Sequence, residues 1–391
     1  MTTDWLSKLR AAVLDEMELA TALRQKLHAH PRASGDEGPT RDLVLAALPH
    51  GDRARPSAST GAVLRIGPQG PAIAVRAELD AIGVDEATGV GWTSTTPGLM
   101  HACGHDVHLA ATVALARAVD RVGGPAPLLV VLQPREETYP SGASDVIAEG
   151  TLAVEECGAV IGAHVQPTLP VGHVACTPGV VNASSDEFTI TVRGMGGHAA
   201  YPHLGADPVL ALSHIVVALQ TLISRRTDPM ASVVLSVTML EAGAAANVIP
   251  SRAVARGTLR SLDVKHREML LQSMHDVVVL VAEAHGCAAE VVVTRGEPPL
   301  LNDHELTGAT QGLLGELGVE VADALRSAGS DDFAFYTEIW PSLMMFVGTD
   351  TPGEILHSAT FLPADDAVAD VAFAMLAGYL AAAGHLPLEK L

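Results

Sequence analysis

The sequence predicts an α/β protein in which a layered α/β domain is interrupted by a smaller domain with the order β-α-β-β-α-β. Strand-like and helix-like segments alternate up to residue 163, as in layered α/β domains. Near Ser185 the order changes to the split ferredoxin-like arrangement. Beyond residue 300, helix and strand signals alternate again, so the chain is expected to return to the first domain. The expected boundaries are residues 1–183 and 296–391 for the first domain and 184–295 for the inserted domain.

The first domain begins with a helical pattern over residues 3–29. Its apolar side chains recur at the spacing of one helix face: Leu6, Leu9, Val13, Met17, Ala20 and Leu27. Further helices are expected at 40–48, 108–122 and 143–149, and strands at 62–66, 72–77, 128–132 and 158–163. In such sheets the loops after the strands carry the functional residues. Glu136, Glu137 and His164 each follow one of these apolar runs.

The inserted domain is predicted from a second set of periodicities. Strands are expected at 187–192, 232–240, 254–262 and 288–294, and helices at 207–225 and 263–285. This unit of about 110 residues is large enough to form its own core. The first domain then resumes with a helix at 306–317, a strand at 342–347 and a helix at 366–383.

The composition excludes several classes of partner. A formal net charge of −21 disfavours nucleic acids and anionic membrane surfaces, because both attract positively charged proteins. We find no pattern of a signal peptide and no continuous apolar run of about 18 residues, so no membrane span is expected. The four cysteines do not have the spacing of a disulfide framework, and the cytoplasm is therefore the expected location. Cys157, Cys176 and Cys287 are expected to be core residues.

The most informative segment is residues 100–108, which contains three histidines, a cysteine and an aspartate. Imidazole, thiolate and carboxylate groups are the ligands that hold zinc and similar ions. Gly104 allows the backbone to bend, so Cys103 and His105 can face one centre from an extended or bent segment. A buried thiol beside a helix-capping histidine is the alternative interpretation.

Glu136 and Glu137 form the second part of the predicted site. They follow the strand at 128–132 and Pro134, which ends regular strand pairing. Adjacent side chains in a turn point in different directions, so one carboxylate can bind a metal ion while the other accepts a proton from water activated by that ion. This division suits hydrolysis. A solvated acidic loop would have the same sequence, so the pair is not decisive alone.

His164 and His357 complete the predicted ligand set. Each stands in a predicted loop, where a single histidine is more often structural than metal-binding. Together with Cys103, His105 and Glu137 they make five ligands, which is too many for one zinc ion with an open position and suits two ions that share a bridge.

Further motifs occur from residue 28 to residue 358. They are His28-Ala29-His30-Pro31, Arg76-Ala77-Glu78-Leu79-Asp80, Cys103-Gly104-His105-Asp106, Gln133-Pro134-Arg135-Glu136-Glu137, Gly196-Gly197-His198, Asn247-Val248-Ile249-Pro250, Gly257-Thr258-Leu259-Arg260, Ser330-Asp331-Asp332-Phe333 and Leu356-His357-Ser358. With these motifs the chain resembles the dinuclear metallo-amidohydrolase family of aminoacylases, hippurate hydrolases and auxin–amino acid conjugate hydrolases. These are relatives of zinc carboxypeptidases and dipeptidases that carry a dimerisation lid.

The resemblance implies a layered α/β metallohydrolase catalytic domain with an inserted ferredoxin-like lid. It implies that two divalent metal ions are bound by Cys103, His105, Glu137, His164 and His357, with Cys103 as the bridge. Glu136 would be the general base and acid. His198, supplied in family members by the partner subunit, would help hold the scissile carbonyl oxygen. Asn247 and Arg260 would contact the substrate, and the guanidinium would suit a carboxylate.

The lid residues also have simpler interpretations. His198 could be a surface residue of a glycine-rich turn, Asn247 a turn cap, and Arg260 a solvated strand residue. Asp80 and Asp106 could each orient a ligating imidazole. Eight other histidines are expected to be structural: His50, His173, His214, His266, His275, His285, His304 and His385.

The chain departs from the family pattern in three motifs. Glu78, Arg135 and Asp331 stand where relatives usually have aspartate, alanine and glutamate, and Ile82-Gly83 stands where they have Leu-Pro. The ligand set is intact, so these departures bear on specificity rather than on hydrolysis. Arg135 could add positive charge near the substrate or point to solvent.

The resulting expectation is a cytoplasmic, homodimeric, metal-dependent enzyme that cleaves the amide bond of N-acyl amino acids. Zinc is the expected metal, with manganese, cobalt and nickel as alternatives. A dipeptidase or carboxypeptidase acting on small peptides is the second expectation. A binding protein that has lost turnover, and a structural zinc protein, are the non-enzymatic alternatives.

Overall fold

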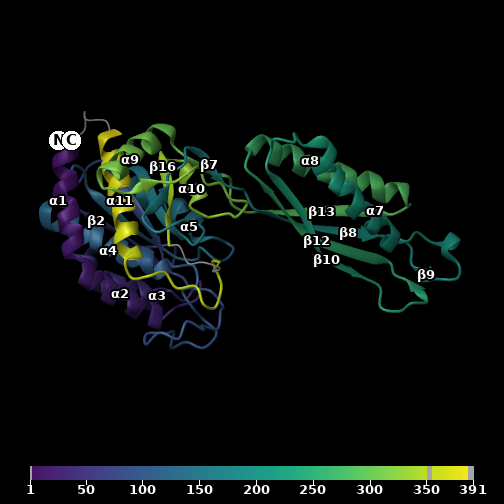
Figure 1. The fold of residues 1–391 in the computed structure, drawn as a ribbon. Coiled ribbons are helices and arrows are strands. Elements are labelled where there is room, and N and C mark those ends of the chain that lie inside the picture. Colours follow the sequence, from purple (N-terminus) through teal and green to yellow (C-terminus); the bar gives the residue numbers. More distant parts are fainter. Residues whose placement is uncertain (1, 350–354, 386–391) are drawn as a thin grey trace. The chain divides into compact units, whose positions relative to one another are not determined.

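The chain forms two compact units, which are described separately. The computed structural model describes residues 2–349 and 355–385 (Figure 1). The first unit comprises Met1–Gly179, Leu301–Leu325 and Phe335–Leu391, and the second comprises Val180–Leu300 and Arg326–Ala334. The sequence did not indicate that residues 326–334 join the second unit. They do so because Ser327 pairs with the chain there, donating its N–H to the Val181 carbonyl at 2.8 Å.

The first unit is built on an eight-stranded mixed sheet with the order β1-β2-β4-β3-β5-β16-β6-β15. The strands are β1 (Arg55–Ser57), β2 (Gly61–Ile66), β3 (Ala72–Glu78), β4 (Leu128–Gln133), β5 (Cys157–Gln166), β6 (His173–Ala175), β15 (Glu320–Val321) and β16 (Ser342–Gly348). The central strands β4, β3, β5 and β16 run parallel. Their carboxyl ends therefore lie at one edge, where functional loops gather.

Helices cover this sheet. They are α1 (Thr2–Asp15), α2 (Met17–Ala29), α3 (Gly38–Ala47), α4 (His105–Val122), α5 (Gly142–Ala148), α6 (Thr151–Val154), α9 (His304–Glu316), α10 (Ala334–Thr337) and α11 (Ala367–His385), with a 3-10 turn at Gly51–Arg53. Helices α4 and α11 pack on each other and on the central strands, and α1 and α2 pack on α4.

Three predicted elements differ from those observed. The helix expected over residues 3–29 is two helices that meet at Glu16, whose carboxylate accepts a hydrogen bond from Arg117 with an O–N distance of 2.6 Å. Helix α4 begins at His105 rather than at residue 108, since Gly104 reverses the chain just before it. Strand β5 extends to Gln166, so His164 lies within the strand, where it pairs with Phe346.

The second unit has the predicted β-α-β-β-α-β order. Its elements are β8 (Asp186–Arg193), α7 (Pro208–Thr221), β10 (Val233–Ala242), β12 (Arg252–Ser261), α8 (Val264–Ala284) and β13 (Ala288–Arg295). The strands form an antiparallel sheet with the order β10-β12-β8-β13, on which α7 and α8 pack (Figure 1). This arrangement confirms the predicted ferredoxin-like insertion. The shorter elements of the chain are β7 (Gly179–Asn182), β9 (Gly197–His198), β11 (Val248–Ile249), β14 (Leu300–Asn302), and helical turns at Pro202–Leu204 and Leu222–Arg226.

Within residues 2–349 and 355–385, two helices are long and apolar enough to cross a membrane by length and composition alone, namely Ala367–His385 and Pro208–Arg226. The first is mostly buried within its unit, as expected of a core helix, and the second is one-third buried. A helix can be apolar on average without a continuous apolar run, and core helices pass the same test, so the absence of a membrane span stays a prediction.

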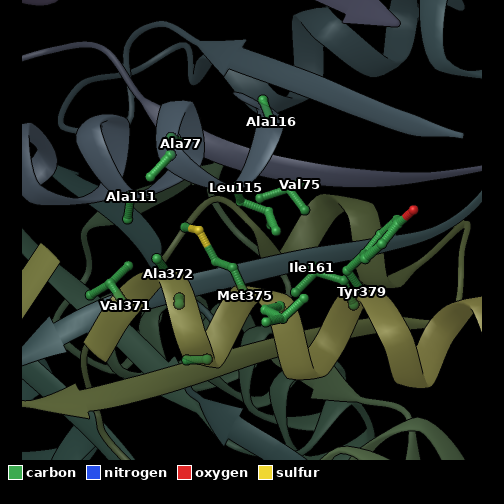
Figure 2. Close-up of a cluster of buried hydrophobic side chains, with 14 of the residues drawn as sticks. Val75, Ala77, Ala111, Leu115, Ala116, Ile161, Val371, Ala372, Met375 and Tyr379 are labelled. Carbon is green, nitrogen blue, oxygen red and sulfur yellow. The ribbon is translucent and has the colours of Figure 1, made fainter. Parts of the chain in front are cut away.

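The core of the first unit lies between α11 and the central strands. Figure 2 shows α11 with its buried side chains close to those of α4 and the sheet, including Val75, Leu115, Ile161, Met375 and Tyr379. Helix α11 lies close to strand β5 because Gly378 faces Ile161. A Cβ atom at position 378 would lie 2.7 Å from the Ile161 Cγ2. Small residues on α11 thus allow the helix to sit on the sheet.

We predict that Ile161→Ala lowers the free energy of unfolding by about 2–5 kcal/mol, because the fully buried side chain leaves a cavity. Ile161→Val removes one methyl group and should cost about 0.5–1.5 kcal/mol. Denaturant unfolding of the full chain, followed through the transition of the first unit, measures both values. Equal losses in the two variants would contradict this account of the core.

Candidate metal centre

The five predicted metal ligands form two groups that share Cys103. The thiol of Cys103 lies with the ring nitrogens of His105 and His164 in one group, and with the Glu137 carboxylate and His357 ring in the other. Within each group the ligand atoms are within 4.8 Å of one another. The Cys103 Sγ–His164 Nε2 distance is 3.3 Å, and the His357 Nε2–Glu137 Oε1 distance is 3.4 Å. Two groups with one common thiol are the arrangement expected of two bridged ions.

Backbone turns bring these side chains together. Gly104 has a φ of 83°, and a Cβ atom there would lie 2.4 Å from Val165 Cγ2, so both the conformation and the space require glycine. The turn places Cys103 before α4 and His105 in its first turn. His357 also has a left-handed backbone, with a φ of 68°, and its N–H donates to the Ala102 carbonyl at 2.9 Å. Its loop is thereby tied to the Cys103 segment.

Hydrogen bonds select which ring nitrogen of two ligands faces the centre. The Nδ1 atom of His105 donates to the Asp80 carbonyl at 2.9 Å, and that of His164 donates to the Val165 carbonyl at 2.7 Å. Because a carbonyl can only accept, the Nε2 atom of each ring is left with its lone pair. This is the tautomer that a metal ion requires.

Buried atoms without partners indicate where a cation fits. Among the described residues, His105 Nε2 and Glu137 Oε1 have no hydrogen-bond partner, although both are buried. Buried polar atoms of native proteins are rarely left in this state. The donor set of one thiol, three imidazoles and a carboxylate, with two orphaned acceptor atoms among them, fits divalent transition-metal ions.

Burial and neighbouring side chains shift the pKa values of the ligands. Burial raises the pKa of the Cys103 thiol well above its usual value, and the Glu137 and Glu136 carboxylates raise it further. Burial lowers the pKa of His164 to about 3. Burial opposes ionisation of Glu137, but its contacts with His357 and His105 outweigh burial and lower its pKa. A bound divalent cation would favour the thiolate as well.

Glu136 lies beside the ligands but belongs to neither of the two groups that share Cys103. Its Oε2 is 3.9 Å from His105 Nε2, and its side chain is 12% exposed. The turn after β4 thus directs Glu137 toward Cys103 and His357 and leaves Glu136 next to His105, with both carboxylates mostly buried. A carboxylate in this position can exchange a proton with a water molecule at the centre.

A buried polar network supports the ligands from behind. The His108 Nδ1 donates to Glu78 Oε2 at 2.9 Å, and the His108 Nε2 accepts from the Val165 N–H at 3.0 Å. The opposite Glu78 oxygen pairs with Arg76, which donates to Gln133. His108 is not among the site residues predicted from the sequence. Its separation of three residues from His105 in a helix is the signal that could have identified it.

Of the two aspartates expected to orient a ligating imidazole, Asp80 contacts a predicted ligand and Asp106 does not. Asp80 holds His105 through its backbone carbonyl, while its carboxylate accepts from the Glu137 N–H at 3.0 Å and from Ser34 at 2.7 Å. The Asp106 carboxylate bonds to Arg24 and His28, neither of which is a predicted ligand, because the first turn of α4 directs it toward α2.

His198, Asn247 and Arg260 all lie in the second unit. His198 is exposed and pairs with Val248 in the β9–β11 ribbon, and the Asn247 carbonyl accepts from the Ala199 N–H at 3.0 Å. Arg260 donates to the Ala328 carbonyl at 3.1 Å. His198 and Arg260 thus lie in strands and Asn247 in a turn, and each of the three side chains is at least partly exposed.

The remaining histidines and cysteines do not join a ligand group. Within the described residues, groups of three or more metal-binding side chains include none of the eight histidines expected to be structural. Cys157, Cys176 and Cys287 are free thiols, and burial raises the pKa of Cys157 and Cys176 to about 12.

Comparison with known proteins gives consistent matches. A model of peptidase family M20/M25/M40 matches residues 74–381. The chain is 37% identical over 345 residues to N-acetyl-L-cysteine deacetylase of Bacillus subtilis, covering 86% of this chain and 82% of the relative. It is 31% identical over 357 residues to N-acetyldiaminopimelate deacetylase of Exiguobacterium sibiricum, covering 90% and 96%.

Among solved structures, the chain resembles the Bacillus subtilis YXEP protein, described as a dinuclear metal binding peptidase from the M20 family. The TM-score is 0.82 with 29% sequence identity, covering 94% of this chain and 98% of the other.

The pair formed by Arg24 and Asp106 gives a prediction for stability. Both side chains are 1% exposed, and burial of Asp106 is outweighed by Arg24 and His28, which hold its pKa well below the usual range. Asp106→Asn should lower the free energy of unfolding by about 3–5 kcal/mol at pH 7, because Arg24 remains buried and loses a charged partner. Because the folded-state pKa is depressed, the advantage of the wild type should shrink as the pH falls below about 4.

Asp365→Asn is the matched control, because Asp365 pairs with the same arginine but is 39% exposed. It should cost about 1 kcal/mol or less. Denaturant unfolding of both variants between pH 3 and 7 checks the comparison, and an equal cost for the two would contradict it.

Proposed function

Since the chain belongs to peptidase family M20/M25/M40, we propose that it hydrolyses the amide bond of N-acyl amino acids with two divalent metal ions. The chain is a hydrolytic enzyme of the amidohydrolase type, and relatives named as deacetylases of N-acetylcysteine and N-acetyldiaminopimelate support this substrate class. The observation that carries the proposal is the pair of ligand groups that share Cys103, with Glu136 beside them.

We assign one ion to Cys103, His105 and His164 and the other to Cys103, Glu137 and His357. Zinc is the proposed metal, because a thiolate with imidazoles suits it, and manganese, cobalt and nickel are the alternatives. When bound, the ions supply positive charge that polarises the scissile carbonyl and lowers the pKa of water.

The remaining chemistry belongs to side chains. Glu136 takes the proton of the attacking water and passes it to the nitrogen of the leaving amino acid, so the amine departs uncharged. His198 donates a hydrogen bond to the carbonyl oxygen as negative charge develops there. Asn247 contacts the substrate, and Arg260 binds the amino acid carboxylate through paired N–H groups.

Hydrolysis of small peptides by a dipeptidase or carboxypeptidase activity would use the same side chains. The two activities differ in the group on the acyl side of the bond. The deacetylase relatives favour the simple acyl group, and the peptide reaction is therefore the second candidate.

We also propose that the protein is a cytoplasmic homodimer that associates through the second unit. Strand β10 is at the edge of its sheet, and exposed edges with apolar residues are usually covered. Exposed apolar side chains on α7 and β10 are Val209, Leu210, Val217, Val234, Met239 and Leu240. The four cysteines are free thiols, a state that a reducing compartment maintains.

We predict that metal-loaded protein releases free amino acids from N-acetyl, benzoyl or long-chain acyl amino acids, and that elemental analysis finds two ions per chain. Glu136→Gln should lower kcat by about 100-fold to 10,000-fold, because proton transfer is lost while the ligands remain. Its metal content should stay at two ions. Release of amino acid at the wild-type rate by this variant would overturn the role of Glu136.

We predict that Val217→Glu converts the dimer to a monomer. Val217 is 71% exposed on α7, and a charge there would be desolvated in the proposed interface. Leu280→Glu is the control, because Leu280 is 64% exposed on α8, outside the proposed surface. Sedimentation equilibrium measures the assembly state. A dimeric Val217→Glu protein, or a monomeric wild type, would contradict the proposed surface.

A further inference from the structure

We propose that Glu37 is a positioning residue for Glu136, acting through the backbone of Arg135. The inference rests on the function proposed above, because it concerns the alignment of the residue assigned there as general base. Glu37 lies just before α3, about 100 positions from the turn that it supports.

The turn that carries Glu136 contains an unfavourable backbone conformation. Arg135 has a φ of 50°, in the left-handed region that residues with a Cβ atom seldom adopt. This conformation sets the direction of the chain immediately before Glu136. Such a residue keeps its conformation only where its surroundings hold it.

Glu37 provides part of that hold. Its side chain is completely buried, and its Oε1 accepts a hydrogen bond from the Arg135 N–H at 2.9 Å. The other oxygen, Oε2, accepts from the Thr60 hydroxyl at 2.6 Å. A buried carboxylate with both oxygens engaged has one defined orientation, so it fixes the position of the Arg135 amide.

The second contact of Glu37 is itself anchored. Thr60 lies in the turn between β1 and β2, where Glu149 accepts hydrogen bonds from the Ser57 hydroxyl and the Ala58 N–H, both at 2.8 Å. Gly61 follows, and a Cβ atom there would lie 2.7 Å from Pro134 Cδ. The turn that orients Glu37 is thus packed against the residue before Arg135.

Different carboxylates hold the turn that carries Glu136 on its two sides. Glu37 accepts from the Arg135 N–H, and Asp80 accepts from the Glu137 N–H at 3.0 Å. The Gly142 N–H also donates to the Arg135 carbonyl at 3.0 Å. Loss of Glu37 would therefore remove the contact that holds the Arg135 N–H, while the Gly142 N–H still holds the Arg135 carbonyl and Asp80 still holds the Glu137 N–H.

The Arg135 side chain has a separate role. Its guanidinium pairs with Asp145 on α5, so it is engaged away from its own backbone amide. The position of Glu136 then depends on the backbone of residue 135 rather than on the arginine charge. This difference makes the proposal testable by substitution at position 135 itself.

Two variants at position 135 form a matched pair. Arg135→Gly and Arg135→Val both lose the pair with Asp145, but glycine accepts the left-handed conformation and a β-branched residue resists it. We expect kcat of Arg135→Gly to stay within about threefold of the wild type. We expect kcat of Arg135→Val to fall by about 100-fold with little change in KM, the effect of a displacement of about 1 Å at a catalytic group.

Variants at position 37 test the acceptor directly. Glu37→Met keeps the side-chain volume without an acceptor, and kcat should fall by about 100-fold. Glu37→Gln retains a carbonyl oxygen and should recover kcat to within about threefold of the wild type. In Glu37→Met/Arg135→Gly, kcat should rise at least tenfold over Glu37→Met alone, because glycine adopts the left-handed conformation without support from a hydrogen bond.

Hydrogen exchange gives a readout that does not depend on activity. In the metal-loaded wild type the Arg135 amide should exchange slowly, and Glu37→Met should speed its exchange while zinc affinity, measured by calorimetry on the metal-free protein, stays within about threefold. Asp145→Asn is the control, which should leave the exchange rate and kcat unchanged.

An inactive wild type would refute the proposed function and leave the Arg135 exchange measurement valid. With an active wild type, wild-type kcat in Arg135→Val or Glu37→Met would overturn the positioning role. So would equal losses of kcat in Arg135→Gly and Arg135→Val. If Glu37→Met fails to fold, the pair at position 135 still decides the question.

Discussion

The structure depends on the cost of burying charged and polar ligand atoms at the edge of a parallel sheet. Cys103, His105, His164 and Glu137 lie near the carboxyl ends of β3, β4 and β5, and two of their buried atoms have no partner among the described residues. In a low dielectric such atoms destabilise the protein unless a cation compensates them. The proposed metal pair would provide that compensation.

The surrounding residues can be understood as a response to the same constraint. His105 and His164 each donate one ring proton to a backbone carbonyl, which leaves the other nitrogen for a ligand. Glu78 and His108 support β5 beneath the ligands, and Asp80 and Glu37 hold the two sides of the Glu136 turn. Each of these groups is buried, so its geometry is set by packing rather than by solvent.

In the second unit the main constraint is an exposed sheet edge. Its four strands bury one face under α7 and α8, while β10 remains an edge strand with apolar side chains exposed. An unprotected edge of this kind favours pairing with another chain. This exposed edge supports the proposed dimer, and the same unit carries His198, Asn247 and Arg260, which are proposed to contact the substrate.

The sequence by itself determined the fold class and the ferredoxin-like insertion, because both follow from hydrophobic periodicity. The predicted ligand set depended also on the family resemblance, because His164 and His357 each stand alone in their segments. From the sequence, His164 was expected just after a strand and His105 just before a helix. In the structure the strand extends to Gln166 and the helix begins at His105, because local signals define element ends poorly. Only the tertiary structure decided that Asp106 faces Arg24, that Asp80 acts on His105 through its carbonyl, and that Glu37 reaches Arg135. These contacts join residues that are distant in sequence, and their geometry follows from how helices and strands pack, which no local pattern records.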